Sequence, residues 1–326
     1  MDDSCVLILT NSGDATTDYL CERLMKSAVG YHRLDTDTAL ESLQISLFHQ
    51  DMRIEWNQGA VATNEISAVV YRRPKPFTAN VLGDKWQSSH ASDEWAEALE
   101  GFLAHVHPSK WLNYPPRNFM ASHKVEQLSR ACECGLRVPD WIVTNTLSDA
   151  SRFLSDHDFD VVAKPLASGY LERDNPANDS LIYTQAINRS HMHLLDRLPG
   201  CPVLFQDRVK KTTDIRLVVV DDGIVAVSLT ATDPDGLQRL DIRRDNMHDV
   251  RYSQVGVPDS VAHGVMELMR GYGLRFAAID FAIDSNGRWV FFEVNPNGQW
   301  AWLDLVGASD IASLFIEALA QSARRE

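Results

Sequence analysis

The chain has 326 residues, of which 44% are hydrophobic, and a formal net charge of −14 with a pI near 5.2. This length and apolar content suffice for two or three packed structural units. The acidic balance argues against nonspecific nucleic-acid binding, which needs a basic surface. The sequence has neither a signal-peptide pattern nor a run of about 20 apolar residues, so we expect a cytoplasmic protein with no membrane partner.

The five cysteines give no sign of a disulfide or metal framework. Their number is odd, and the spacing of Cys132 and Cys134 differs from that of structural zinc or redox pairs. We expect reduced thiols.

The N-terminal part has an α/β pattern. CVLILT, which starts at Cys5, predicts a buried strand, and a turn, a helix and a second strand at 31–34 follow. The segment 11–18 lacks the glycine spacing of Rossmann and P-loop motifs, so helix capping by Ser or Asp is the better interpretation. Two strand-like runs then precede ISAVVYRRPKPF, and we expect the first domain to span residues 1–110.

Two further units complete the chain. The central one, expected over 111–202, has a helix that ends at Gly135 and two strands, WIVT and FDVVAKPL, on either side of a second helix. The last one, expected over 203–326, starts with VLFQDRV, continues with two hairpins and ends in a helix.

Asn286-Gly287 between two apolar runs predicts a β-hairpin with a two-residue turn. That register places Asp280 opposite Glu293 and Ile283 opposite Val290. The opposite face would be a core face, made of Ala277, Ile279, Phe281, Ile283, Phe292 and Val294.

Two like charges facing each other in a sheet are destabilising, so something positive should lie between them. Mg²⁺ prefers oxygen ligands and often uses one or two carboxylates together with nucleotide phosphates. Asp280, Glu293 and Asn295, which lies on the same face, would supply three such oxygens. The alternative is an exposed acidic strand face, which the apolar character of both strands disfavours.

Basic residues that could bind phosphates lie in the central unit. Lys164 ends an apolar strand, and the following Ser168 and Gly169 would let backbone N–H groups approach an anion. Lys124 lies in the first turns of a helix, whose N-terminus favours anions. For both lysines, an ordinary solvated position remains the alternative.

RVKKTTDIR, at 208–216, is the densest basic stretch of the chain, although such a stretch can also be a solvated loop. The Asp222-Gly223 pair predicts a hairpin that leaves Arg216 away from the turn. Arg216 and Arg243 could therefore meet at one anionic centre, with salt bridges to Asp214, Asp241 or Asp245 as the alternative.

The ordered set KVEQL, VVAKPL, FQDRV, TTDIRLVVV, LDIR, AAIDFAI and EVNPNGQWAWLDL resembles ATP-grasp ligases, specifically the microviridin-type or graspetide branch that matures ribosomal peptides. The resemblance covers nearly the whole chain, and NPNGQW is its most specific part. It implies an α+β ATP-grasp fold: an N-terminal α/β pre-ATP-grasp domain and two ATP-grasp subdomains with the nucleotide between them.

The resemblance also implies roles for residues. Two lysines would contact the ATP phosphates, the hinge at 205–207 would lie beside the adenine, two arginines would bind the transferred phosphate or the substrate carboxylate, and three oxygen ligands would hold Mg²⁺. The two lysines are Lys124 and Lys164, and the residues at and after the hinge are Gln206, Asp207 and Val209. The two arginines are Arg216 and Arg243, and the metal ligands are Asp280, Glu293 and Asn295. The chain has Asp207 where glutamate is commoner, and LDIR where a tryptophan usually precedes the arginine.

The preferred function is an ATP-dependent ligase that activates Asp or Glu side chains of a precursor peptide, recognised through its leader and acidic core, and links them to Ser, Thr or Lys. One alternative is a ligase that adds a free amino acid to a carboxylate. Another is a noncatalytic nucleotide-binding protein. The family comparison also makes a homodimer plausible.

Overall fold

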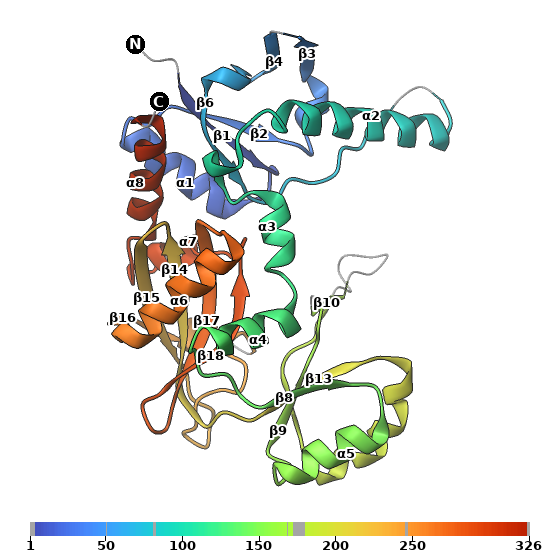
Figure 1. Ribbon diagram of the computed structural model, residues 1–326, viewed down its shortest axis with the longest axis vertical. Helices are drawn as coiled ribbons and strands as arrows, with labels where there is room; N and C mark the ends of the chain where they lie inside the picture. Colours follow the sequence, from blue (N-terminus) through green and yellow to red (C-terminus); the bar gives the residue numbers. More distant parts are fainter. Residues whose placement is uncertain are drawn as a thin grey trace.

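The computed structural model describes residues 4–49, 51–80, 83–167, 169–171, 180–244 and 247–324. In Figure 1 the chain forms three units: the N-terminal unit at the top, the C-terminal unit below it, and the central unit at the lower right. Helices and sheets occur in all three, which confirms the predicted α/β class.

The N-terminal unit is built on a parallel sheet of β2 (Tyr31–Asp35), β1 (Cys5–Thr10), β6 (Ile66–Tyr71) and β7 (Trp111–Leu112). A meander of β3 (Gln44–Phe48), β4 (Asp51–Trp56) and β5 (Gly59–Ala62) and the helix α2 (Lys85–Leu103) accompany it. Asp14 caps α1 (Ala15–Lys26) by accepting a bond from the Thr17 N–H, as expected for this segment.

The central unit contains α3 (Pro115–Met120), α4 (Lys124–Glu133), α5 (Leu147–Asp156) and a 3₁₀ segment at Arg189–Gly200. Its antiparallel sheet has the order β12 (Gln185–Ile187), β9 (Val161–Lys164), β13 (Val203–Asp207) and β8 (Trp141–Thr144). A small hairpin of β10 (Tyr170–Leu171) and β11 (Ser180–Leu181) stands beside it. Because β13 pairs with both β8 and β9, this sheet extends past residue 202, where we expected the unit to end.

The C-terminal unit is an antiparallel sheet of β16 (Arg251–Val255), β15 (Gly223–Thr230), β14 (Lys211–Val220), β17 (Phe276–Asp284) and β18 (Trp289–Asn295), with the helices α6 (Asp259–Tyr272), α7 (Ala301–Leu305) and α8 (Ile311–Arg324). Val220 pairs with Gly223, so the β14–β15 turn consists of Asp221 and Asp222, one residue earlier than the Asp-Gly signal indicated. Asp221 has a positive φ of 48°, a conformation that Asp tolerates in turns.

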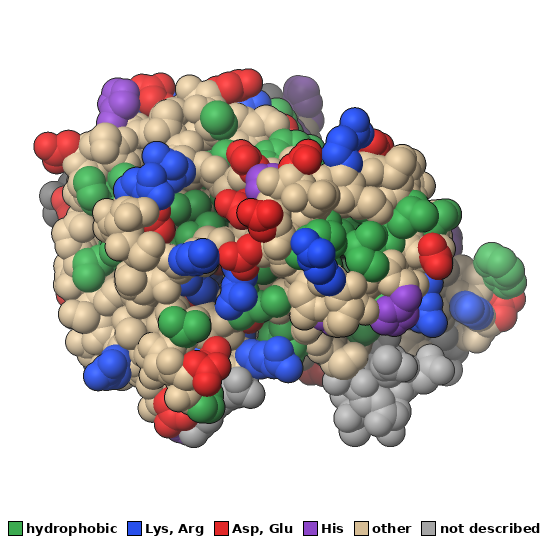
Figure 2. All heavy atoms as spheres, turned by 90° about the horizontal axis from the view of Figure 1, so that it is seen from below, with side chains coloured by type: hydrophobic (Ala, Val, Ile, Leu, Met, Phe, Trp, Pro, Cys, Tyr) green, Lys and Arg blue, Asp and Glu red, His purple; other side chains and the backbone are tan. Residues whose placement is uncertain are grey.

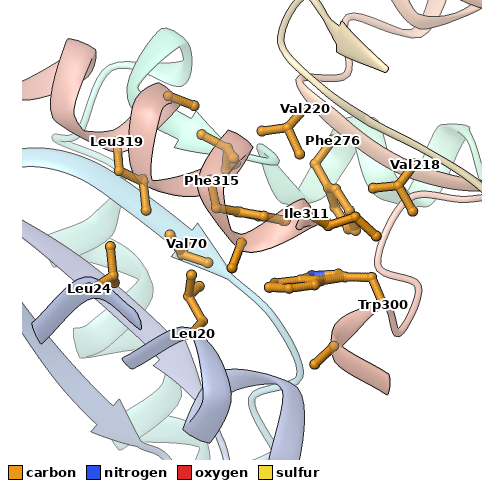
Figure 3. Packing of buried hydrophobic residues seen from close by; sticks show 14 of the residues in the cluster. Leu20, Leu24, Val70, Val218, Val220, Phe276, Trp300, Ile311, Phe315 and Leu319 are labelled. Carbon is orange, nitrogen blue, oxygen red and sulfur yellow. The ribbon is translucent and has the colours of Figure 1, made fainter. Parts of the chain in front are cut away.

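The first and last segments of the chain share one hydrophobic core. Trp300 is fully buried and stacks on Phe315 of α8, with ring centroids 4.7 Å apart. Figure 3 shows these rings between Val218 and Phe276 of the C-terminal sheet and Leu20 and Val70 of the N-terminal unit. The two units are therefore joined by packed apolar side chains.

The surface of the described residues carries both signs of charge. Seen from below in Figure 2, acidic and basic side chains are interspersed with hydrophobic ones, and no broad basic area is visible on this face. None of the helices within the described ranges is long and apolar enough to cross a membrane.

Candidate nucleotide and metal site

A cavity of about 560 Å³ lies between the central and C-terminal sheets. Strands β9 and β13 line one side of it, and β14, β17 and β18 line the other. Its size is typical of small-molecule sites. Ten of the predicted site residues line it: Lys124, Lys164, Gly169, Gln206, Asp207, Val209, Arg216, Arg243, Asp280 and Glu293.

The carboxylate pair is positioned as the hairpin pattern predicts, because Asp280 and Glu293 are direct partners across β17 and β18. Asn295 lies beside them, and its Nδ2 is 3.3 Å from Asp280 Oδ2 and 3.2 Å from Glu293 Oε1. In this state the amide nitrogen, rather than the oxygen we expected, faces the carboxylates.

The rest of the predicted hairpin register is wrong. Ile283 pairs with Trp289 instead of Val290, because Asp284 caps a longer turn by accepting bonds from the N–H groups of Asn286 and Arg288. A bulge next to Asp280 then restores the Asp280–Glu293 pairing. As a result Phe291 is buried in the core, while Phe292, expected there, lines the cavity.

Cations from two other elements neutralise the pair. Arg216 donates from Nη1 to Asp280 Oδ1 at 2.7 Å, and Lys124 Nζ is 3.6 Å from Glu293 Oε2. Burial raises the pKa of Asp280 to about 6, against the opposing effect of Arg216. Burial alone would also raise the pKa of Glu293, but Lys124, the Asn295 amide and Lys164 together lower it. The two carboxyl groups thus have different proton affinities.

The surroundings of Lys164 disfavour its positive charge. Its Nζ lies 4.3 Å from the centroid of the Phe292 ring, and burial lowers its pKa to about 8 even though Glu293 opposes the shift. Lys124, the first residue of α4, bonds to the carbonyl oxygen of Pro165 at 2.9 Å and so connects the helix N-terminus to the end of β9. Neither lysine is an ordinary solvated one.

The hinge side of the cavity has an unusual buried amide. Gln206 is 1% exposed, and neither its Oε1 nor its Nε2 has a hydrogen-bond partner among the described residues. Such an amide is costly unless a ligand satisfies it. Asp207 Oδ1 lies 3.7 Å from His157 Nδ1, and burial raises the pKa of the Asp207 carboxyl group. Ser168 lies outside the described residues.

The two arginines serve different partners. Arg216 binds Asp280, and its Nη2 also donates to the backbone oxygen of Gln299 at 2.9 Å. Arg243 makes a two-point ion pair with Asp241, at 2.9 and 2.7 Å, which is one of the salt bridges considered as alternatives. Both arginines line the same cavity, but their hydrogen-bond partners among the described residues differ; the Asp280 carboxylate, which Arg216 binds directly, also acts on Arg243 through its charge.

Two residues in or next to the cavity were not singled out from the sequence. The Lys211 side chain is 7% exposed and bonds to both carboxylate oxygens of Asp214, so the RVKK stretch is not a solvated loop at this residue. Its basic composition was the available signal. Gln127 of α4 accepts from the Val294 N–H and donates to the Val294 oxygen, which fixes the strand that carries Glu293. No sequence pattern predicts that contact.

The donor set fits Mg²⁺ and a nucleotide. The two carboxylates are a partial shell of hard oxygen ligands that phosphate oxygens would complete, and Asn295 would add a third oxygen once its amide group is turned towards the ion. Among the described residues no group of three His, Cys, Asp or Glu side chains forms a metal site by itself. The lysines and the unsatisfied Gln206 amide suit phosphates and a base, respectively.

The comparisons with known proteins agree with this geometry. Residues 5–118 match the family model of the MvdD pre-ATP grasp domain. The chain's fold matches macrocyclase MdnC of Microcystis aeruginosa MRC, solved with precursor peptide MdnA, at 23% identity and a TM-score of 0.82 over 97% of this chain and 99% of that one. It matches a RiPP-associated ATP-grasp ligase of Chryseobacterium gregarium, solved with ADP, leader and core peptide, at 24% identity and a TM-score of 0.84 over 99% and 97%.

Macrocyclase MdnB of Microcystis aeruginosa MRC is 26% identical, with a TM-score of 0.76 over 97% of this chain and 99% of that one. No curated protein matches the chain. The fold is that of the ATP-grasp ligases. Its first part matches the MvdD pre-ATP grasp family model, and the solved neighbours include ligases associated with ribosomal peptides, which agrees with the predicted resemblance.

Proposed function

We propose that the protein is an ATP-dependent ligase that activates Asp or Glu side chains of a ribosomal precursor peptide and links them to Ser, Thr or Lys. The observation that carries the proposal is the meeting of Lys124 and Lys164 with the Asp280–Glu293 pair in one cavity. The solved Chryseobacterium gregarium ligase contains ADP with a leader and core peptide, and macrocyclase MdnC contains a precursor peptide. The carboxylate would be activated as an acyl phosphate and then attacked by the hydroxyl or amine.

Each side chain has a role in this proposal. Lys124 and Lys164 bind phosphates, Gln206 and Asp207 bind the base and the ribose with Val209 beside them, and Gly169 lets the backbone approach closely. A Cβ at Gly169 would lie 2.6 Å from the Ile182 oxygen. Asp280, Glu293 and Asn295 would hold Mg²⁺, which supplies charge neutralisation for the phosphates. Arg216 and Arg243 orient the anionic groups, and catalysis rests on position and charge.

The partner in this proposal is a linear precursor peptide with a leader and an acidic core. We further propose that the enzyme works in the cytoplasm, where its five cysteines stay reduced; all five are free in the structure. The homodimer and the lack of a nucleic-acid partner stay predictions.

The test is incubation with ATP, Mg²⁺ and candidate precursor peptides encoded beside the gene, followed by mass spectrometry. We expect peptide-dependent ADP release and a product lighter by one water per link. A product heavier by one amino-acid residue would instead identify the amino-acid ligase. Nucleotide binding without turnover, for every peptide and amino acid tried, would favour the noncatalytic protein. E293Q is the matched inactive control.

A further inference from the structure

The loop after β18 is held from the N-terminal unit by a buried arginine. Arg72, directly after β6, is 2% exposed. Its Nη1 donates to the Gly298 oxygen and its Nη2 to Gln299 Oε1, both at 3.1 Å. The backbone oxygen of Arg72 accepts a bond from the Asn297 amide. One residue therefore contacts three consecutive residues of the NPNGQW loop.

That loop in turn holds the cavity arginine. Arg216 donates from Nη2 to the Gln299 backbone oxygen and from Nη1 to Asp280. Gly298 packs so closely here that a Cβ would lie 2.8 Å from Arg216 Nη2 and 2.6 Å from the Ala278 Cβ. Gln299 thus receives one arginine from each unit: Arg72 on its side chain and Arg216 on its backbone.

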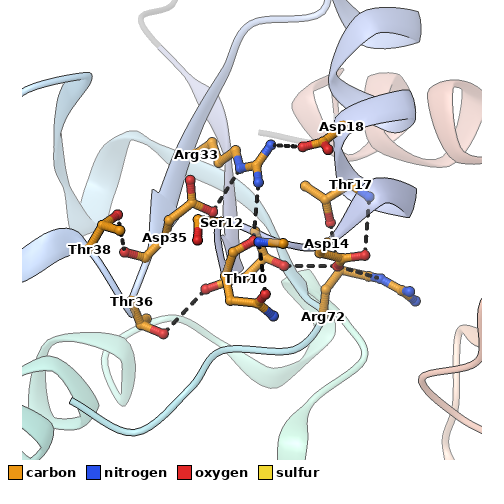
Figure 4. A network of polar contacts seen from close by, with 12 residues as sticks. Thr10, Ser12, Asp14, Thr17, Asp18, Arg33, Asp35, Thr36, Thr38 and Arg72 are labelled. Carbon is orange, nitrogen blue, oxygen red and sulfur yellow. Dashed lines mark hydrogen bonds and ion pairs between the residues drawn. The ribbon is translucent and has the colours of Figure 1, made fainter. Parts of the chain in front are cut away.

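The Arg72 side chain is itself held in place by a residue of the N-terminal unit, Asp14. Its Nε lies 3.7 Å from Asp14 Oδ2, and Figure 4 shows this pair in the polar network around Thr10 and Thr17. The Thr16 hydroxyl bonds to the same Gln299 oxygen that Arg72 contacts. Burial lowers the pKa of Arg72 to about 10, with Asp14 opposing the shift.

Burying a guanidinium group between two domains has a large desolvation cost. Well-packed apolar residues of similar volume often stabilise an interface as well or better. The fork geometry of Arg72, however, satisfies a backbone carbonyl and a side-chain amide at once, which an apolar residue could not do. The contact therefore suits positioning better than it suits stability.

From this arrangement we propose that Arg72 is a positioning residue of the ligase site: through Gln299 it sets the place of Arg216 and hence of Asp280. The N-terminal unit would thus complete the catalytic geometry. This inference rests on the proposed function for its activity readout, and it has a second readout that needs no turnover.

The test is a double-mutant cycle on the full chain with R72K, R216K and the double variant. R72K keeps the charge but loses the fork. We expect R72K to slow peptide-dependent ADP release roughly 10- to 100-fold, since small misplacements cost that much. ADP affinity without Mg²⁺ should change less than about twofold, and the double variant should be no slower than R216K. R33K is the matched control, because Arg33 is also held by an acidic residue near the start of α1, Asp18. Its hydrogen-bond partners among the described residues are Asp18, Asp35 and the Asn11 oxygen, and these do not include residues 297–299.

The proposal would be overturned if the rate losses of R72K and R216K multiplied in the double variant, or if a folded R72K kept the wild-type turnover. If R72K does not fold, Q299M replaces it, because it removes the side-chain acceptor and keeps the backbone oxygen that Arg216 uses. Should the wild type release no ADP with any substrate, the proposed function fails by itself. The effect of Mg²⁺ on ADP affinity in the same variants is then the deciding measurement. R72K and R216K must each change this effect, and the double variant must change it no more than R216K does. If R72K leaves it unchanged, the positioning role is refuted.

Discussion

Asp280 and Glu293 face each other across β17 and β18, and each has its own cation: Arg216 for the first and Lys124 for the second. Both carboxyl groups are therefore neutralised by side chains of the protein, and these positive charges differ in kind. Arg216 is a fixed fork held by two acceptors, whereas Lys124 is a single ammonium at a helix N-terminus.

We expect D280N and E293Q each to lower ATP turnover at least about 100-fold, because the lost charge served the phosphates and their metal. Their folds should stay intact, since both changes keep the side-chain shape. D222N, in an exposed turn of the same sheet, is the control and should be fully active. The measurement is ADP release, with circular dichroism for the fold; normal turnover in either variant would refute the metal assignment.

The pH dependence of nucleotide binding should follow Lys164. Its pKa of about 8 lies below the unfolded value, so the folded protein loses this proton first as the pH rises. Affinity for ADP should therefore fall as the pH rises through about 8. K164M should bind weakly at every pH and lack this transition, whereas K210M, at a 79% exposed position, should keep it.

The same residue has the opposite effect on stability. Because the charged form is disfavoured in the folded state, Lys164 destabilises the nucleotide-free protein below pH 8, and this penalty is relieved as the pH rises towards the unfolded pKa. K164M should accordingly melt at a higher temperature than the wild type at pH 7, with the difference shrinking towards pH 10. A lower melting temperature at pH 7 would contradict the burial argument.

Q206M should separate ligand binding from folding. It replaces two buried and unsatisfied polar atoms by a thioether of similar size, so we expect it to stabilise the nucleotide-free protein by about 1–2 kcal/mol. ADP affinity should fall at the same time, because the base loses its hydrogen-bonding partner. Urea unfolding and calorimetric titration measure the two quantities, and unchanged ADP affinity would remove Gln206 from the site.

Trp300 should be the costliest single truncation in the shared core. Its indole is fully buried and stacked on Phe315, so W300A should lower the free energy of unfolding by about 3–5 kcal/mol. W300F should recover part of this loss, and W86A, at an 80% exposed position, should cost little. Denaturant titration with all three variants is the measurement, and equal losses in W300A and W86A would contradict the packing.

Local patterns predicted the elements and the main pairing well. The Asn-Gly signal placed Asp280 opposite Glu293, but it could not foresee that Asp284 would cap a longer turn and that a bulge would compensate. Helix and strand periodicity likewise gave β8, α5 and β9, while the insertion of β13 between β8 and β9 depends on contacts far apart in sequence.

The contacts of Arg72, Gln127 and Asn113 also join distant segments, so no local pattern identifies them. Asn113 illustrates this: its amide bonds to the Phe276 and Pro296 oxygens, and its oxygen accepts from the N–H groups of Arg275 and Phe276. A side chain at the junction of two units thus fixes the start of β17.

The packing of α8 on β6 and α1 has a consequence for how the chain is made. One face of the first sheet, with Val6, Ile8 and Val70, finds its full cover only when residues 311–319 have been synthesised. Until then part of this apolar face is uncovered and can associate with other nascent chains. The helix that completes the first domain is therefore synthesised only after the sheets of the other two units.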